Sequence, residues 1–492
     1  MGWERDNRRL VRDRLGDEVG RIDRCSSHSM ALAYPSAYRV GMSSLGFQTV
    51  YRLVQGSGIA SAARVFLSEE PVGFERGAAE LSYETGAPLS SFRLVGFSVA
   101  WELDIGPLIG MLSRARVPVL GSERGEGDPI VVVGGPLASS NPRPLAPFCD
   151  AIVVGDAECV IGELLAAGFG DGSRLSRLEG LARIGSVWVP SLSGTVPTGA
   201  VASDSDLPAW APIRSPHAEM RDMFLVEAVR GCSRRCQYCI MRGSLSGGMR
   251  VVPAERVLSH IPDQVRKVGL VGASVSDHPD IAMIVNTLVE KGCQVGLSSL
   301  RPERLTSSLV GALGAGGYKT ITTALDGSSQ RLRDCIRRGT TAAHLLQAAQ
   351  LCRDAKINRL KLYVMVGLPG ETDSDIDECA LFVRELSRLL PVSLGVSAFC
   401  AKLGTPLASA EFAGVDVAGA RIKRLQRKVG GAAEIRSTSP RWAWVEHVLA
   451  VGTEREGLAV LAAVRSGGGF SEYRRAFEKL GHCPNGVGGS RE

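Results

Sequence analysis

The chain has 492 residues, of which 45% are hydrophobic and 22% charged. This composition excludes a wholly disordered, collagenous or small disulfide-rich protein. The formal net charge of +6 is too slight to predict nucleic-acid binding by itself, so a nucleic-acid partner stays open but unsupported. No apolar run reaches the roughly 18 residues that a membrane-spanning helix needs, and the charged N-terminus does not resemble a secretory signal. We therefore expect a cytoplasmic protein with no membrane partner.

The first half of the chain predicts an α/β domain behind a charged lead-in. Residues 1–29 carry arginines and acids at helical spacing, and we expect a surface arm there. Residues 30–168 alternate short apolar runs with amphipathic stretches, which predicts a doubly wound, mostly parallel sheet of the Rossmann or flavodoxin-like kind. Residues 169–222 are rich in Gly, Ser and Pro and predict a connecting segment with a short hairpin. The strands expected in the sheet are 31–34, 63–67, 94–99, 130–133 and 151–154.

Over residues 223–400, predicted strands again alternate with predicted helices, enough of them to form a barrel. Six strand-and-helix units predict a partial, TIM-like (β/α)6 barrel. Residues 401–492 predict a mainly helical C-terminal region, and no internal repeat is seen. The strands expected in the barrel are 224–229, 269–272, 294–298, 320–324, 359–366 and 393–398.

Three of the twelve cysteines, Cys232, Cys236 and Cys239, share the spacing Cys-x3-Cys-x2-Cys directly after a predicted strand. A structural zinc site usually closes with four ligands, whereas the nearest downstream His or Cys is His260, outside this loop. A [4Fe-4S] cluster on three thiolates leaves one iron without a protein ligand, available to bind a substrate or cofactor. The spacing favours a cluster, with a structural metal as the alternative.

This loop resembles the signature of radical S-adenosylmethionine (radical SAM) enzymes, and the likeness covers about residues 224–400. In that family the open iron binds SAM, and an electron from the cluster cleaves its C–S bond to give a 5′-deoxyadenosyl radical. An aromatic residue precedes the family's last cysteine, and Tyr238 holds that place. The resemblance implies a [4Fe-4S] cluster on the three cysteines, SAM as a cofactor bound beside Tyr238, and a reducing electron donor of the flavodoxin or ferredoxin type.

Two later strand ends resemble cofactor-contacting segments of the same family. The segment Gly367-Leu368-Pro369-Gly370-Glu371-Thr372 follows a predicted strand. The resemblance places Val366, Gly367 and Leu368 close to the adenine. It also places Ser298 and Arg301 near the ribose or the cofactor carboxylate. Ordinary turns and a helix cap explain the same residues, and the two interpretations are compatible.

Two positions depart from the family pattern. Where relatives often have a glutamate before a glycine, this chain has Asp326, which is one methylene shorter. Where many relatives have Gly-Gly-Glu at the methionyl amine, this chain has Gly272, an alanine and Ser274. The backbone and Ser274 would then accept the amine's protons. Asp277 or His278 would face the substrate, or His278 would cap a turn.

Small residues follow two strands of the N-terminal domain, namely Gly134, Gly135, Ser139 and Gly155. They resemble the strand ends of cobalamin-binding domains that precede radical SAM barrels, and small residues there suit a ligand crevice in any doubly wound sheet. The Asp-x-His-x-x-Gly signature of cobalamin-dependent mutases is absent, because residues 41–46 contain no histidine. The layout also resembles an uncharacterised radical SAM group. The alternative is a domain that binds no cobalamin and recognises the substrate or covers the barrel mouth.

The resemblance implies an enzyme that reductively cleaves SAM and is a cobalamin-dependent C-methyltransferase. Its rivals are a cobalamin-free radical SAM modifier of RNA or protein, and a non-catalytic metal protein. Four arginines after the fourth barrel strand predict a solvated helix face rather than an anion site: Arg331, Arg333, Arg337 and Arg338. Nine other cysteines lack metal spacing and predict packing roles: Cys25, Cys149, Cys159, Cys293, Cys335, Cys352, Cys379, Cys400 and Cys483.

Overall fold

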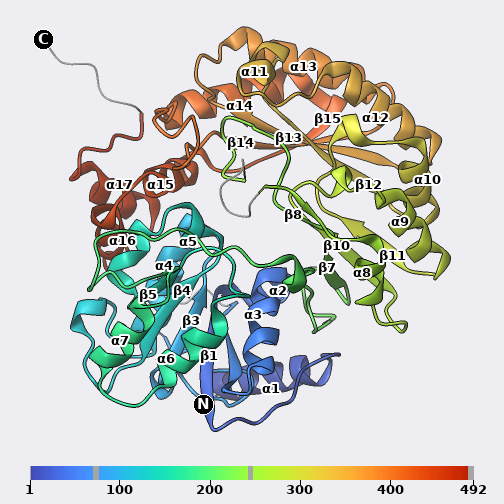
Figure 1. The fold of residues 1–492 in the computed structure, drawn as a ribbon. Helices are drawn as coiled ribbons and strands as arrows, with labels where there is room; N and C mark the ends of the chain where they lie inside the picture. Colours follow the sequence, from blue (N-terminus) through green and yellow to red (C-terminus); the bar gives the residue numbers. More distant parts are fainter. Residues whose placement is uncertain (1, 70–76, 242–247, 486–492) are drawn as a thin grey trace, which may run out of the picture. The chain divides into compact units, whose positions relative to one another are not determined.

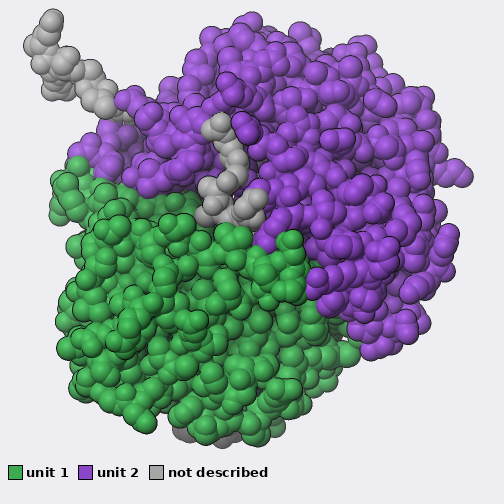
Figure 2. Space-filling model, viewed as in Figure 1, with its two compact units in different colours: residues 1–224, 452–480 green, residues 225–451, 481–492 purple. Residues whose placement is uncertain are grey.

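The computed structural model describes residues 2–69, 77–241 and 248–485. It divides into two compact units, coloured separately in Figure 2: Met1–Phe224 with Gly452–Leu480, and Leu225–Val451 with Gly481–Glu492. Among the described residues, no helix has both the length and the hydropathy needed to cross a membrane.

The first unit is built on a six-stranded sheet in the order β2-β1-β3-β4-β5-β6. Strands β1 to β5 pair in parallel and β6 pairs antiparallel to β5. The order 2-1-3-4-5 is that of flavodoxin-like folds, so the predicted doubly wound sheet is confirmed. The hairpin predicted in the connecting segment, between residues 186–190 and 194–197, is wrong, because β6 pairs with β5 and residues 194–197 form no strand. The strands are β1 (His28–Ala37), β2 (Ala60–Leu67), β3 (Leu94–Ser98), β4 (Ile130–Gly134), β5 (Ala151–Val153) and β6 (Val187–Trp188).

Helices cover this sheet (Figure 1), and the last two come from the end of the chain. Asn141 anchors that return, since its buried amide donates to the Gly452 carbonyl at 2.9 Å. The returning helix α16 packs against α4 and the 143–148 turn. The helices are α1 (Gly2–Gly16), α2 (Tyr38–Gly41), α3 (Leu45–Gly56), α4 (Ile105–Arg114), α5 (Pro136–Ser140), α6 (Ile161–Phe169), α7 (Arg174–Ala182), α16 (Glu454–Arg465) and α17 (Phe470–Glu478).

The N-terminal lead-in is more than a surface arm. The side chains of Glu18 and Arg64 are both fully buried and form an ion pair through two hydrogen bonds of 2.8 Å. Tyr38 donates a further hydrogen bond to Glu18 at 2.8 Å. A buried charge persists only when it is paired, so Glu18 fixes the lead-in to the core of the first unit.

Among its described residues, the second unit contains two larger sheets, in the orders β11-β10-β7 and β12-β13-β14-β15, and a two-stranded sheet of β8 and β9. A bridge between Leu300 and Thr323 joins the two larger sheets. All six predicted barrel strands are present, which confirms the partial barrel, while β15 adds a strand inside the tail predicted as helical. The strands are β7 (Phe224–Glu227), β8 (Val229–Arg230), β9 (Arg250–Val251), β10 (Lys267–Val271), β11 (Gln294–Leu297), β12 (Thr320–Asp326), β13 (Arg359–Val366), β14 (Val392–Ala398) and β15 (Ala433–Ser437).

Helices lie on the outer side of these strands in Figure 1. Burial alternates along β13: Leu360, Leu362 and Val364 are buried, whereas Tyr363 between them is 40% exposed. Alternate residues of a strand face opposite ways, so the polar residues of β13 face away from the helices, into the barrel. The helices are α8 (Ala254–Ser259), α9 (Ile281–Glu290), α10 (Ser307–Ala315), α11 (Gln330–Cys335), α12 (Ala342–Asp354), α13 (Asp373–Ser387), α14 (Val415–Val429) and α15 (Pro440–Ala450).

Candidate functional site

The three predicted cluster ligands lie in the loop that follows β8. Cys236 is buried, and Cys232 and Cys239 are half-buried. The loop turns at Gly231, whose φ of +77° and whose approach to the Gly248 carbonyl leave no room for a Cβ. Among the described residues, no group of three or more His, Cys, Asp or Glu side chains is arranged to hold a single metal ion. A [4Fe-4S] cluster binds each thiolate through a different iron.

Burial raises the pKa of the Cys236 and Cys239 thiols, although the Arg338 guanidinium opposes this rise at Cys236. Iron binds the thiolate form, so loading the loop releases protons. Of the nine other cysteines, Cys149, Cys293, Cys352 and Cys379 are buried, which agrees with a packing role, and Cys400 is half-buried. Burial does not explain the four exposed ones: Cys25, Cys159, Cys335 and Cys483.

Tyr238 joins the cysteine loop to the end of β12. Its hydroxyl donates to the Asp326 carboxylate at 2.6 Å, and Arg338 pairs with the same oxygen at 2.6 Å. Burial raises the pKa of Tyr238, and the neighbouring Asp326 raises it further. Arg333 and Arg338 are both buried, so the expectation of a solvated helix face is wrong for these two arginines.

The segment after β13 meets Tyr238 through apolar contacts. Tyr238 packs against a buried cluster that contains Leu368 and Phe399. Val366 is fully buried, and its carbonyl accepts a hydrogen bond from Phe399 N at 2.8 Å. Gly367 has a φ of +86°, which turns the chain at the strand end. The structure therefore brings together Tyr238 and the residues that the resemblance places beside the adenine.

Glu371 holds this turn in place, a role that the sequence analysis missed. Its carboxylate accepts hydrogen bonds from Gly367 N at 2.5 Å and Ser328 Oγ at 2.7 Å, and it pairs with Arg421 at 3.0 Å. Burial nevertheless raises its pKa. The sequence Pro369-Gly370-Glu371 predicts a turn. Only the fold shows that Ser328 and Arg421, which are distant in the sequence, bind the Glu371 carboxylate.

Gly272, Ser274 and Ser298 surround the base of the cysteine loop. A Cβ on Gly272 would lie 2.5 Å from the Val229 carbonyl, so the strand that leads into the loop requires glycine there. Ser274 is fully buried, and its hydroxyl donates a long hydrogen bond of 3.5 Å to the Gly231 carbonyl. Ser298 Oγ donates to the Gly272 carbonyl at 2.9 Å. These contacts tie the ends of β10 and β11 to the loop.

Most of the hydrogen-bonding capacity of Arg301 is used by neighbouring carboxylates. It forms ion pairs with Asp277 and, at 3.1 Å, with Glu303, and all three side chains are buried. Glu303 also pairs with Arg234 of the cysteine loop, and Ser233 of the loop donates to Asp277 at 3.0 Å. Burial would raise the pKa of Glu303, but its hydrogen bonds and the two arginines hold it below its usual value. The network therefore positions the cysteine loop.

His278 holds a turn, the second of the two roles expected for it. Its Nε2 lies 2.8 Å from the Val252 carbonyl, and its Nδ1 accepts a hydrogen bond from Asp280 N at 3.0 Å. Both ring nitrogens therefore have backbone partners, and the ring is buried.

The small residues of the first unit gather at the carboxyl edge of its sheet. Gly134, Gly135, Ser139 and Gly155 are all partly exposed there. A Cβ on Gly135 or Gly155 would meet backbone at 2.7 Å and 2.3 Å, so neighbouring backbone already explains these two glycines. A Cβ on Gly134 meets only the Val153 side chain, at 3.7 Å. Neighbouring atoms therefore do not require glycine at position 134, which lies at the edge where doubly wound sheets bind ligands.

Comparison with known proteins gives the family. Residues 46–190 match the N-terminal region of radical SAM proteins, and residues 226–383 match the radical SAM superfamily. An uncharacterised protein of Methanocaldococcus jannaschii is 24% identical over 396 residues, which are 78% of this chain and 80% of that protein. The tRNA-2-methylthio-N(6)-dimethylallyladenosine synthase of Sorangium cellulosum is 27% identical over 39% of this chain, and the match spans 46% of the synthase.

Two solved structures share the fold of both units. One is the radical SAM methyltransferase TsrM from Kitasatospora setae, solved with cobalamin and a [4Fe-4S] cluster. It matches this chain with a TM-score of 0.57 and 12% identity, and the match covers 93% of this chain and 100% of TsrM. The cobalamin-dependent SAM radical enzyme OxsB has a TM-score of 0.52 and 14% identity, over 74% of this chain and 53% of OxsB. At these identities the likeness establishes the fold. With the family matches over both units, the chain belongs to the radical SAM enzymes, whose cofactors are a [4Fe-4S] cluster and S-adenosylmethionine.

Proposed function

We propose that this chain reductively cleaves SAM at a [4Fe-4S] cluster held by Cys232, Cys236 and Cys239, and that it is a cobalamin-dependent C-methyltransferase. One observation carries the proposal. A flavodoxin-like sheet precedes a partial barrel with the cysteine loop, and the fold of this chain is similar to that of TsrM over 93% of its length. TsrM is itself a radical SAM methyltransferase with bound cobalamin.

The barrel residues would hold the cluster and SAM. The three thiolates would bind three irons of the cluster. The cluster, once reduced by an external donor, would supply the electron that cleaves SAM into methionine and a 5′-deoxyadenosyl radical. Tyr238 and Leu368, already packed together, would shape the apolar side of the SAM site. The ion-pair network of Arg301 and Glu303 would hold the loop against β11. Arg301 would bind SAM only through donors that Asp277 and Glu303 leave free.

The carboxyl edge of the first sheet would hold the corrinoid. Gly134 and Ser139 are partly exposed at this edge, and Gly134 has no side chain to occupy it. In the order 2-1-3-4-5, ligands bind outside the carboxyl ends of the strands, near the switch between β1 and β3. The exposed Trp101 follows β3 at this same edge and adds an aromatic surface.

Corrinoid retention tests this assignment. Protein produced with cobalamin and purified without oxygen is expected to show corrinoid absorbance, and Gly134→Leu should lose it while retaining iron. Gly162 in α6 has open space where a Cβ would lie, so Gly162→Leu is a control expected to keep the corrinoid. Absence of corrinoid from the wild type, or equal corrinoid in Gly134→Leu and the wild type, would overturn the cobalamin assignment.

A second function is a cobalamin-free modification of RNA or protein. It is favoured by relatives that act on such substrates: the tRNA synthase above, and the ribosomal protein uS12 methylthiotransferase of Citrifermentans bemidjiense, which is 27% identical over 41% of this chain. The chain spans about half the length of these relatives. SAM cleavage by a protein that retains no corrinoid would support this function over the first.

A further inference from the structure

We propose that a cavity of about 540 Å³ on the inner face of β13, β14 and β15 binds an anionic group of the substrate, a carboxylate or a phosphate. This inference rests on the proposed radical SAM function, because it assigns the site to the substrate. The volume is in the range of small-molecule pockets.

Strand register places the lining residues in two rows across the sheet. Lys361 pairs with Ser393, and Ser393 pairs with Glu434. Two residues further along each strand, Tyr363 pairs with Gly395 and Gly395 with Arg436. Paired residues of parallel strands point to the same face, so one face of the sheet carries Lys361, Tyr363 and Arg436 together.

The hollow between these side chains comes from Gly395. A Cβ at this position would lie 2.8 Å from the Tyr363 ring, closer than any real contact, so a larger residue would displace the tyrosine. With glycine the ring lies beside β14, and Lys361 Nζ is 4.9 Å from the ring centroid. Ser393 and Ser397 line the same cavity with small side chains. The cavity thus has an aromatic wall and hydroxyl groups in its lining.

The charges of the lining are not balanced. Glu434 is its one carboxylate, and it pairs with both Arg359 at 3.0 Å and Arg436 at 2.7 Å. Lys361 is half-buried and has no acidic partner among the described residues. The cavity lining therefore carries three positive charges and one negative charge. A half-buried ammonium without a counter-ion is stabilised by a bound anion.

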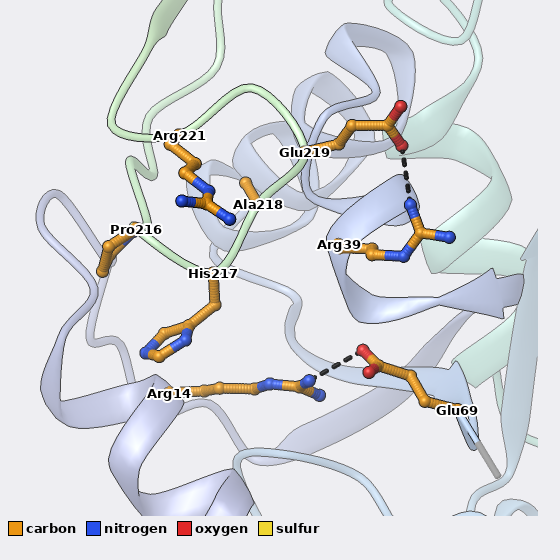
Figure 3. A pocket seen from close by; sticks show the side chains of 8 residues that line it. All are labelled: Arg14, Arg39, Glu69, Pro216, His217, Ala218, Glu219 and Arg221. Atoms are coloured by element: carbon orange, nitrogen blue, oxygen red, sulfur yellow. Dashed lines mark hydrogen bonds and ion pairs between the residues drawn. The ribbon is translucent and has the colours of Figure 1, made fainter.

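A second cavity, of about 350 Å³ in the first unit, shows the contrast (Figure 3). There Arg14 pairs with Glu69 at 2.7 Å, and Arg39 pairs with Glu219 at 3.1 Å. His217 also has a carboxylate partner, Asp17, at 2.8 Å. Most basic side chains that line this second cavity therefore already have a carboxylate partner. The barrel cavity is the stronger candidate for an anion-binding site.

Site-specific labelling tests the proposal on the full chain with its cluster. Lys361 and Lys423 would be acylated with limiting acetic anhydride in inorganic phosphate or in propionate, at constant ionic strength set with chloride. Lys423 lies exposed on α14 and serves as the internal control. Near-saturating anion should slow labelling of Lys361 at least about fivefold, as expected when binding blocks the amine. Labelling of Lys423 should stay unchanged.

The two arms separate the sources of the anion. Protection by phosphate alone indicates a phosphate-bearing substrate, and protection by propionate alone indicates a carboxylate. Equal responses of Lys361 and Lys423 in both arms would overturn the site. The thermal stabilisation by the protecting anion should also be lost in Lys361→Met and kept in Lys423→Met. Failure of the wild type to make 5′-deoxyadenosine would instead overturn the proposed function and leave the binding result standing.

Discussion

Tyr238 and Asp326, 88 residues apart in the sequence, share a hydrogen bond of 2.6 Å that ties the cysteine loop to the end of β12. Asp326 has a φ of +62°, in the left-handed region that aspartate and asparagine tolerate better than most residues. A bulge in the pairing of β12 with β13 accompanies this turn. The carboxylate is thereby directed at Tyr238 and Arg338 together.

Asp326→Asn should destabilise the second unit. Asparagine keeps the backbone conformation but removes the charge that neutralises the buried Arg338 guanidinium. Breaking a buried pair costs about 3 kcal/mol, whereas Tyr238→Phe, which loses one hydrogen bond, should cost about 1 to 2 kcal/mol. Urea unfolding of the iron-loaded protein measures both changes. A loss below about 0.5 kcal/mol for Asp326→Asn would show that the carboxylate does not stabilise this link.

The substitutions Cys232→Ser, Cys236→Ser and Cys239→Ser should each lower the iron and sulfide content of the protein from about four of each per chain toward background. The thiolates are the cluster ligands, and a hydroxyl is a poor substitute. Cys335→Ser is the matched control, because Cys335 is an exposed thiol of the same unit. Metal analysis and the visible absorbance spectrum measure the loss. Equal loss in Cys335→Ser, or full iron content in any one of the three loop variants, would contradict the ligand assignment.

Glu303→Gln should make the cluster more labile. The substitution removes the charge between Arg301 and Arg234, and Arg234 belongs to the cysteine loop. The rate at which a chelator removes iron should rise about tenfold, equivalent to the loss of one charge-assisted hydrogen bond. Glu255→Gln changes an exposed acid of α8 and should leave the rate unchanged. A rate equal to that of the wild type in Glu303→Gln would show that the network does not hold the loop.

His447 should make the second unit sensitive to acid. Burial and, to a smaller extent, Lys402 and His482 lower its pKa to about 4. Its Nδ1 accepts a hydrogen bond from Ala401 N at 3.2 Å, which requires the neutral ring. The unfolded chain takes up the proton near pH 6.5, so stability is full above that pH and falls as the pH drops toward 4.

The loss due to His447 should reach about 2 kcal/mol between pH 7.5 and pH 5. His447→Asn keeps an acceptor near the position of Nδ1 but does not titrate. Urea unfolding of both proteins across this range isolates the histidine, because every other group titrates in both. Parallel pH profiles for the wild type and the variant would show that His447 is not held neutral.

Local patterns were enough to predict the strands, since the runs at 130–133 and 359–366 are apolar or alternate with a period of two. The cluster loop could be predicted as well, because its three cysteines lie within eight residues of one another in the sequence. The return of α16 to the first unit could not be predicted, because Asn141 and Gly452 meet only after folding. Strand β15 was missed because it is an edge strand whose residues are mostly exposed.

Side-chain partners were the least predictable part of the site. Arg301 follows a strand end, where a cofactor contact is a reasonable expectation, yet two buried carboxylates bind it. Gly135 and Gly155 were correctly noticed at a ligand-binding edge, but each also adjoins backbone from a distant segment. The residue type indicates what chemistry is available, while long-range contacts decide how much of it remains free for a ligand.

The central claim is tested most directly by the products formed from SAM. The protein, produced with cobalamin and purified without oxygen, would be mixed with SAM and a strong reductant. We predict equal amounts of 5′-deoxyadenosine and methionine from protein that contains about four iron per chain, and none from Cys236→Ser. Iron-loaded wild-type protein that makes no 5′-deoxyadenosine would contradict the account.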